Sequence, residues 1–493
     1  MKRTASGILP LIALDRGSPK ALHTQIYEGY RLAIVEGSLR AGQRVPSTRV
    51  LASELGVSRF PVLTAYSQLL AEGYFEGRIG SGTVISSSLP DRFLKSNAVG
   101  SCVSPLTPGP RPRAQRASVL LASLRPAYVH GFGAFNVGEV AFDQFPLQIW
   151  SNLVSSRCRD LQDQSLHYGD PMGALVLREE IANYLRTARS VKCEADQVMI
   201  VSGSQQALDI SGRVLVDPGS AVWVEEPGYR RACDVFSRAG CRLIPVPVDN
   251  EGMDVAAGIR RCRKARVAVV TPSHQFPLGV TMSAKRRFEL LDWAQSTGAW
   301  IIEDDYDSEY RYDSSPIASL QGLDGNARVI YIGTFSKVLF PSLRLGYIVI
   351  PKDLVGDFLA ARRFMDLGPA LFFQAVIVDF IQDGHFARHL RRMRLLYQKR
   401  RTALVDSIGM ELGSMVNVLG SEAGMHLTVT LQSDISDTEI SRRAAKQNLW
   451  LWPLSDAYLE SATSNGFILG FANTAEADIP PAVRKLRNLL MAK

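Results

Sequence analysis

Apolar residues recur at every fourth position near the N-terminus of the chain. They are Leu22, Ile26, Tyr30 and Ile34. This spacing places them on one side of an α-helix, which predicts a first amphipathic helix that ends near Gly37. A second helix is predicted from Thr48 to about Leu55, with Ser47 as its N-cap, and Ser58 is a candidate cap for a third helix.

Two short β-prone segments follow the third helix, at residues 74–76 and 83–85, and a glycine-rich turn separates them. Three helices, a tight turn before the third helix and a final hairpin form the element order of a winged helix-turn-helix. In such a domain the third helix enters the major groove of double-stranded DNA. Residues 1–86 are therefore predicted to form a DNA-binding domain.

The remainder of the chain has a different texture. Residues 87–135 are rich in proline, serine and arginine, which predicts an extended linker. In residues 136–493 apolar β-branched runs alternate with amphipathic helical patterns, as is typical of an α/β domain with a mostly parallel central sheet. Because ligands of such sheets bind at the carboxyl ends of strands, we expect the polar residues that follow these runs to converge on one crevice.

The charge distribution predicts that the N-terminal part of the chain binds a polyanion. The net charge of +8 is uneven: residues 1–86 hold 10 basic and 6 acidic side chains, and the linker holds 6 and 1. The six cysteines form no Cys-x-x-Cys pair, which favours reduced thiols, a cytoplasmic location and no metal centre. No apolar run reaches the roughly 18 residues of a membrane span, so we expect no membrane partner.

The strings at residues 45–52 and 72–75 resemble the GntR family of bacterial regulators, and the resemblance extends over residues 20–86. By that likeness the residues that face promoter DNA are Arg49, Ser58, Arg59, Phe60, Arg78 and Gly80. Arginine can bind a phosphate or a guanine edge, and a serine hydroxyl can bind a phosphate. Phe60 either contacts a thymine methyl group or only packs against the protein, and the sequence leaves both possibilities open.

Polar residues that follow the apolar runs 267–270, 300–303 and 329–332 indicate the chemistry of the second domain. Lys337 could form a Schiff base, since partial burial lowers the pKa of an amine. Asp304 could keep a pyridine nitrogen protonated. Thr334, Ser336 and Arg344, with the strand-to-helix turn at residues 201–207, offer groups that bind phosphate.

These residues resemble fold type I pyridoxal-phosphate aminotransferases over about residues 136–493. The strings at residues 202–206, 226–229, 303–307 and 336–337 are closer still to the MocR/GabR subgroup, in which such a domain follows a GntR winged helix through a long linker. The resemblance implies pyridoxal 5'-phosphate as cofactor, with Lys337 as its covalent anchor and Asp304 as the partner of its pyridine nitrogen. The other implied cofactor residues are Tyr306, Tyr229, Ser204, Gln205, Thr334, Ser336, Arg344 and Gln275. It also implies that Arg231 contacts an effector and that the protein is a homodimer.

One stretch departs from the pattern of the family. Aminotransferases and GabR hold a substrate carboxylate with an arginine near the C-terminus, whereas residues 465–472 contain none. The sequence therefore predicts a transcriptional regulator that senses pyridoxal phosphate itself or an amine or amino-acid effector, with half-transamination at most. An active aminotransferase with an accessory DNA-binding domain is the alternative.

Overall fold

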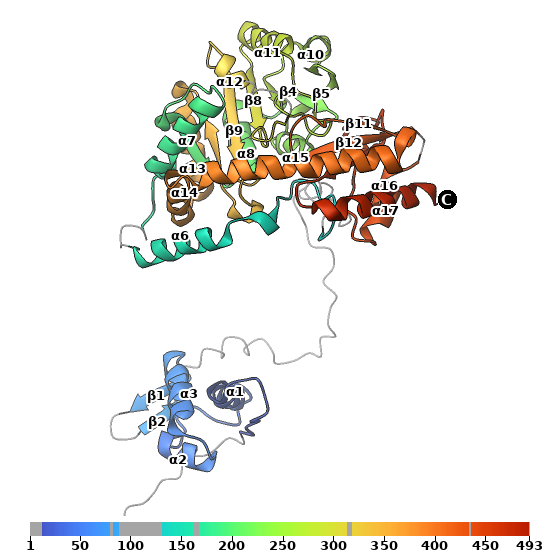
Figure 1. Cartoon of the computed structure of the whole chain (residues 1–493). Helices are drawn as coiled ribbons and strands as arrows, with labels where there is room; N and C mark the ends of the chain where they lie inside the picture. Colours follow the sequence, from blue (N-terminus) through green and yellow to red (C-terminus); the bar gives the residue numbers. More distant parts are fainter. Residues whose placement is uncertain are drawn as a thin grey trace, which may run out of the picture. The chain divides into compact units, whose positions relative to one another are not determined.

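The computed structural model describes residues 12–78, 82–87, 131–161, 167–312, 318–432 and 435–492. The chain divides into two compact units, Met1–Pro112 and Arg113–Lys493 (Figure 1). Gly80 and most of the predicted linker, residues 88–130, lie outside the described residues. No helix of the described ranges is long and apolar enough to cross a membrane.

The first unit is the winged helix-turn-helix that the sequence predicts. Its elements are α1 (Leu22–Val35), α2 (Thr48–Glu54), α3 (Arg59–Ala71), β1 (Phe75–Arg78) and β2 (Gly82–Ile85). Ser47 caps α2, because its side chain accepts a hydrogen bond from the amide of Val50. Ser58 occupies the N-cap position of α3, but its side chain makes no capping hydrogen bond to the described residues.

An aromatic cluster holds the first unit together. The rings of Tyr30, Tyr66 and Phe75 come from α1, α3 and β1, and each pair packs edge to face with centroids 5.1–5.7 Å apart. Leu51 of α2 and Leu69 of α3 are fully buried beside this cluster. The apolar stripe predicted for the first helix is therefore the face that builds the core.

The second unit is built on an eight-stranded sheet in the order β3-β10-β9-β8-β7-β4-β5-β6. The strands are β3 (Val198–Val201), β4 (Ala221–Glu226), β5 (Arg242–Asp249), β6 (Gly252–Met253), β7 (Val267–Val270), β8 (Trp300–Asp305), β9 (Val329–Thr334) and β10 (Gly346–Val349). Strand β10 is antiparallel to both of its neighbours, and β6 is antiparallel to β5. The strands from β9 to β5 are all parallel, so the predicted mostly parallel sheet is confirmed.

Helices cover both faces of this sheet, which explains why its strands are apolar throughout. Ile302 of β8 belongs to the core that α8, α9 and α13 close, whereas the adjacent Ile301 packs under α10 and α11. The helices of this unit are α6 (Leu147–Arg159), α7 (Leu175–Ala188), α8 (Ser204–Leu215), α9 (Arg230–Arg238), α10 (Val255–Cys262), α11 (Ala284–Thr297), α12 (Leu320–Leu323), α13 (Val355–Asp366) and α14 (Phe372–Gln382).

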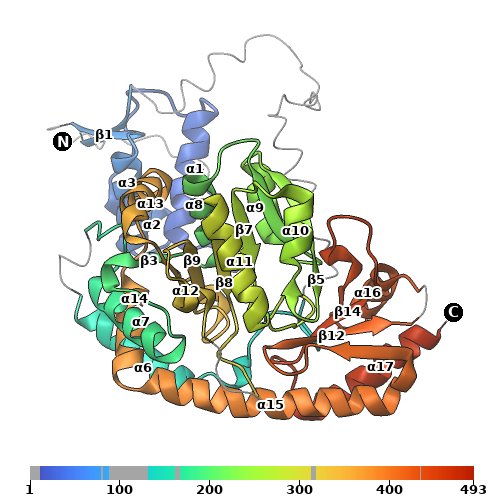
Figure 2. The same ribbon diagram turned by 90° about the horizontal axis from the view of Figure 1, so that it is seen from above.

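A second, smaller sheet lies near the C-terminus. Its strands, in the order β11-β12-β14-β13, are β11 (Val416–Leu419), β12 (His426–Leu431), β14 (Gly466–Gly470) and β13 (Trp452–Pro453). Helices α16 (Asp437–Ala445) and α17 (Ile479–Met491) accompany it. The long helix α15 (His385–Glu411) runs from α14 to this sheet (Figure 2). The last residues of the predicted linker also belong here, since Ala134 pairs with Leu449 and Phe135 is fully buried, so the packed part of this unit begins before the predicted boundary at residue 136.

Candidate functional site

The carboxyl ends of the parallel strands meet at a cavity of about 400 Å³. Strands β7, β8 and β9 are adjacent and parallel, so the polar residues that follow them reach the same edge of the sheet. The residues predicted from sequence that line this cavity are Ser204, Gln205, Tyr229, Arg231, Asp304, Tyr306, Thr334, Ser336, Lys337 and Arg344. The predicted convergence on one crevice is therefore confirmed.

Lys337 extends from the loop after β9 into the cavity. Its Nζ donates a hydrogen bond of 2.7 Å to the carbonyl oxygen of Gly138. Gly138 has a φ of +84°, and a Cβ at this position would lie 2.5 Å from Nζ, so glycine leaves the room that the amine needs. Burial lowers the pKa of Lys337, which raises the fraction of neutral amine available as a nucleophile.

Asp304, near the end of β8, presents an unpartnered acceptor. Its side chain is buried, and its Oδ1 has no hydrogen-bond partner among the described residues. Burial, reinforced by the nearby carboxylates of Asp305 and Glu225, raises the pKa of Asp304 to about 7. A buried carboxylate without a partner is unfavourable. We therefore expect a cationic hydrogen-bond donor to bind this oxygen in the cavity.

Part of the cavity lining is suited to a phosphate. Helix α8 begins at Ser204 with its N-terminus on the cavity, where the helix dipole and the first amides favour an anion. Arg344 Nη2 donates to the carbonyl oxygen of Ser202 at 2.8 Å, which places the guanidinium beside Gly203. The hydroxyl of Thr334 accepts a hydrogen bond of 3.1 Å from the amide of Ser336.

Tyr306 is tied to a buried polar cluster. Its hydroxyl donates to the carbonyl oxygen of His274 at 2.9 Å and lies 3.1 Å from His274 Nδ1. Asp307 Oδ2 lies 3.1 Å from the same nitrogen and accepts a hydrogen bond from the amide of Met425. Ligand atoms of His274, Asp307 and His426 lie within 4.8 Å of one another. His274 Nδ1 lies 3.1 Å from Asp307 Oδ2, and His426 Nε2 donates to the carbonyl oxygen of Pro277, whereas His274 Nε2 and Asp307 Oδ1 have no partner among the described residues. We interpret the cluster as a clamp between the two sheets.

Gln275 does not take the role predicted for it. Its Nε2 donates to Glu225 Oε2 and to the carbonyl oxygens of Pro227 and Phe276, and its Oε1 accepts from the amide of Leu278. These bonds hold the loop after β7 together, and Gln275 does not line the cavity. The next residue, Phe276, lines the cavity instead. The structure therefore corrects the prediction that Gln275 contacts the cofactor.

The first unit presents its predicted DNA-facing residues to solvent. Arg49, Ser58, Arg59 and Phe60 are all exposed. Arg59 Nε donates to Thr48 Oγ1 at 3.1 Å, which links α3 to α2. Arg78 is the last residue of β1, and Gly80, the other wing residue, lies outside the described residues.

Comparisons with known proteins agree with both units. The family described as bacterial regulatory proteins, gntR family, matches residues 22–85, and aminotransferase class I and II matches residues 134–486. The probable rhizopine catabolism regulatory protein MocR of Rhizobium meliloti is 38% identical over 482 residues, which cover 98% of this chain and 96% of that protein. The chain belongs to the MocR/GabR type of GntR-family transcriptional regulators.

Two further relatives support this assignment. The pyridoxine biosynthesis regulator PdxR of Corynebacterium glutamicum is 30% identical, over 94% of this chain and 95% of its own length. A kynurenine aminotransferase of Pyrococcus horikoshii, solved in complex with PMP, has a TM-score of 0.68 and 30% identity, and covers 77% of this chain and 94% of that one. As a MocR/GabR-type regulator, the chain combines a DNA-binding domain with a fold whose cofactor is pyridoxal phosphate. Its cavity fits that cofactor, because an unpartnered carboxylate oxygen, a half-buried lysine and a helix N-terminus line the same space.

Several residues that line the cavity of this regulator belong to none of the motifs recognised in the sequence. Val137, Gly138 and Glu139 come from the start of the second unit, and Met425, His426 and Trp452 come from the segment at β12 and from β13. They lie more than sixty residues from the recognised motifs in sequence. Only the packing of the two sheets brings them to Lys337.

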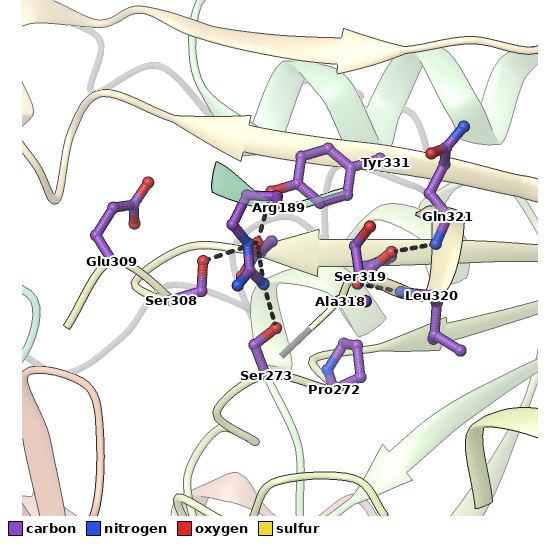
Figure 3. A network of polar contacts seen from close by, with 12 residues as sticks. Arg189, Pro272, Ser273, Ser308, Glu309, Ala318, Ser319, Leu320, Gln321 and Tyr331 are labelled. Atoms are coloured by element: carbon purple, nitrogen blue, oxygen red, sulfur yellow. Dashed lines mark hydrogen bonds and ion pairs between the residues drawn. The ribbon is translucent and has the colours of Figure 1, made fainter. Parts of the chain in front are cut away.

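Asp304 and Asp305 are adjacent acidic residues at the end of β8, and their side chains have different roles. Consecutive residues of a strand point to opposite faces, so only one of them can face the cavity. Asp305 Oδ2 accepts hydrogen bonds from Arg189 Nε, the hydroxyl of Ser308 and the hydroxyl of Tyr331. These three donor residues are labelled in Figure 3. Arg189 also donates to Ser273 at 2.8 Å. The carboxylate of Asp305 therefore holds neighbouring segments together, whereas the carboxylate of Asp304 can bind a ligand.

The raised pKa of Asp304 predicts a pH-dependent stability of the apoprotein. The folded pKa is about 7, against about 4 in an unfolded chain. The folded state therefore binds the extra proton, and the resulting stability is full below about pH 4 and is lost as the pH rises through 7. Replacing Asp304 with asparagine removes this titration. We expect the free energy of unfolding to fall less steeply with pH, by up to about 1.4 kcal/mol per pH unit.

Urea unfolding of the apoprotein near pH 5 and near pH 7 measures this difference. The variant Asp353→Asn, which changes an exposed aspartate of the second unit, is the matched control and should keep the slope of the parent. An Asp304→Asn slope equal to that of the parent would show that this carboxyl does not titrate in the predicted range.

Proposed function

We propose that this regulator binds pyridoxal phosphate through Lys337, and that occupation of the cavity changes its affinity for promoter DNA. The observation that carries the proposal is the buried, unpartnered Oδ1 of Asp304 in the cavity that also holds the Lys337 amine. A protonated pyridine nitrogen would satisfy this oxygen. When bound, the cofactor supplies an aldehyde that reacts with primary amines.

The cavity residues divide into three groups around such a cofactor. Ser204, Gln205, Thr334, Ser336 and Arg344 hold the phosphate, since a helix N-terminus, hydroxyls and a guanidinium all favour an anion. Tyr229 is half-buried and packs edge to face against Phe276, which leaves it available to lie against the ring. Tyr306 lies beside the ring hydroxyl.

The effector is either pyridoxal phosphate alone or an amine or amino acid that enters beside it. The wall formed by Met425, His426 and Trp452 contains no arginine. Burial lowers the pKa of His426 well below its usual value, so this wall offers no cation for a carboxylate. Arg231, at the start of α9, is therefore the residue that holds an anionic group of an effector.

A titration of DNA binding tests this function. Full-length protein is titrated against DNA from the region upstream of its own gene, first without pyridoxal phosphate, then with it, and then with candidate amines. A change in affinity with the cofactor alone supports a sensor of pyridoxal phosphate, and a change that needs an amine supports an amine sensor. Specific binding that none of these additions alters would contradict the proposal.

Catalysis is the second candidate function, and the intact pair Lys337 and Asp304 favours it. Because no arginine faces the substrate from the C-terminal wall, we expect half-transamination at most. Steady turnover of an amino donor and a keto-acid acceptor, measured by product formation, would overturn this expectation.

A homodimer is also proposed for the second unit. Phe364 of α13, Leu147 of α6 and Tyr168 are large apolar or aromatic side chains that are exposed in the single chain. We offer these side chains as candidates for the contact surface of the dimer that the resemblance to fold type I aminotransferases implies. Light scattering of the full-length protein at micromolar concentration gives the mass that tests this proposal.

The exposed arginines of α2 and α3 predict a measurable electrostatic contribution to DNA binding. Arg49→Ala or Arg59→Ala should weaken binding and reduce the dependence of log affinity on log salt by about one ion for each phosphate that the variant no longer neutralises. The control is Arg263→Ala, an exposed arginine of the second unit. Unchanged affinity and salt dependence in both α2–α3 variants would place the DNA on another surface.

A further inference from the structure

Helix α3 carries apolar side chains on both of its sides. The inward side is buried in the core of the first unit and consists of Val62, Ala65, Tyr66 and Leu69. The outward side carries Phe60, which is 76% exposed, and Leu63, which is 41% exposed. These two residues are three positions apart on a helix and are therefore neighbours on its surface. We call them the outward apolar pair.

Packing does not account for the outward apolar pair. The aromatic core of the unit is complete without Phe60, since Tyr30, Tyr66 and Phe75 already pack against one another. The exposure of Phe60 argues against one of the two roles that the sequence left open, because a side chain that packed inside the first unit would be buried. The hydroxyl of Thr64 donates to the carbonyl oxygen of Phe60, so this polar group is satisfied within the helix.

The surroundings of the pair indicate what covers it. Arg59 directly precedes Phe60 and is exposed, and Arg49 is exposed on α2, which Arg59 contacts through Thr48. A partner that fits this surface must be anionic and must also present small apolar groups. The major groove of DNA satisfies both conditions, because thymine projects its 5-methyl group there between the charged backbones.

We propose that Phe60 and Leu63 recognise thymine methyl groups, so that the operator carries thymines opposite the first turn of α3. This inference rests on the DNA-binding function of the unit and adds the chemistry by which it selects a sequence. Pro61 is compatible with this geometry, because the first turn of a helix tolerates proline without loss of a helical hydrogen bond.

The test removes only the methyl groups. A duplex is first selected from a random-sequence library with the full-length protein. The thymines that the bound protein covers are then replaced with uracil, which lacks the 5-methyl group. We expect the parent protein to lose affinity by about fourfold for each contacted methyl group. Phe60→Ala should bind the thymine duplex more weakly than the parent and should lose little further affinity on uracil replacement, as expected when two changes remove one interaction.

Leu70→Ala is the matched control. Leu70 lies on the same side of α3 as Leu63, seven residues further along, and is also 41% exposed. This variant should keep the ratio of thymine to uracil affinity of the parent. Thermal unfolding of both variants should match the parent, because both side chains are exposed.

Equal affinity of the parent for the thymine and uracil duplexes would overturn the inference. So would a Phe60→Ala variant that keeps the discrimination of the parent. In either case the DNA-binding function stands, whereas failure to enrich any duplex would overturn that function together with the inference.

Discussion

Replacing Lys337 with alanine should abolish the visible absorbance band that protein-bound pyridoxal phosphate shows when it is covalently attached. The expected effect is complete, because Lys337 is the one lysine among the described residues that line the cavity, and its lowered pKa favours the neutral amine that reacts. Spectra of the parent and the variant, recorded after addition of the cofactor and removal of excess, measure the effect.

A lysine elsewhere on the surface provides the control for this result. Lys285 of α11 is exposed, and Lys285→Ala should keep the band of the parent. A band of unchanged intensity in Lys337→Ala would mean that the cofactor is attached at another residue, and the assignment of the site would be wrong.

Replacing Arg344 with alanine should weaken the binding of pyridoxal phosphate far more than that of pyridoxal, which lacks the phosphate. Hydrogen bonds from a guanidinium to a charged group contribute about 1.5–3 kcal/mol, so we expect a loss of roughly tenfold to a hundredfold for the phosphorylated compound. Isothermal titration of both compounds against the parent and the variant separates the contribution of the phosphate from that of the ring.

Arg344→Lys tests whether charge or geometry matters at this position. Lysine keeps the positive charge but cannot form the paired hydrogen bonds of a guanidinium, so an intermediate affinity is expected. Equal weakening of pyridoxal and pyridoxal phosphate by Arg344→Ala would contradict the placement of the phosphate at the N-terminus of α8.

The parts of the fold with a strong period were predictable from the sequence. The stripe from Leu22 to Ile34 gave the first helix within two residues of its observed end, because burial of one helix face fixes the positions of its apolar residues. The runs that became β7, β8 and β9 were recognisable because a sheet covered on both faces needs continuous apolar strands. The convergence of Asp304 and Lys337 followed from the parallel arrangement of these strands.

Residues in loops and in distant segments were not predictable in the same way. Gln275 and Phe276 lie in a loop after β7, where no repeating geometry determines which side chain faces the cavity. Gln275 was expected to face it, but Phe276 does. Gly138 and Trp452 reach the site only because the start of the second unit and the C-terminal sheet pack against the large sheet. Such contacts depend on the complete tertiary structure and have no local signal.

Coupling between cofactor binding and DNA binding can be measured as the affinity for pyridoxal phosphate with and without DNA. If the cofactor changes the affinity for DNA by some factor, DNA must change the affinity for the cofactor by the same factor. We therefore predict that a saturating operator duplex shifts the dissociation constant of pyridoxal phosphate by the factor found in the reciprocal titration. An affinity for pyridoxal phosphate that is the same with and without the duplex would show that the two sites are not coupled.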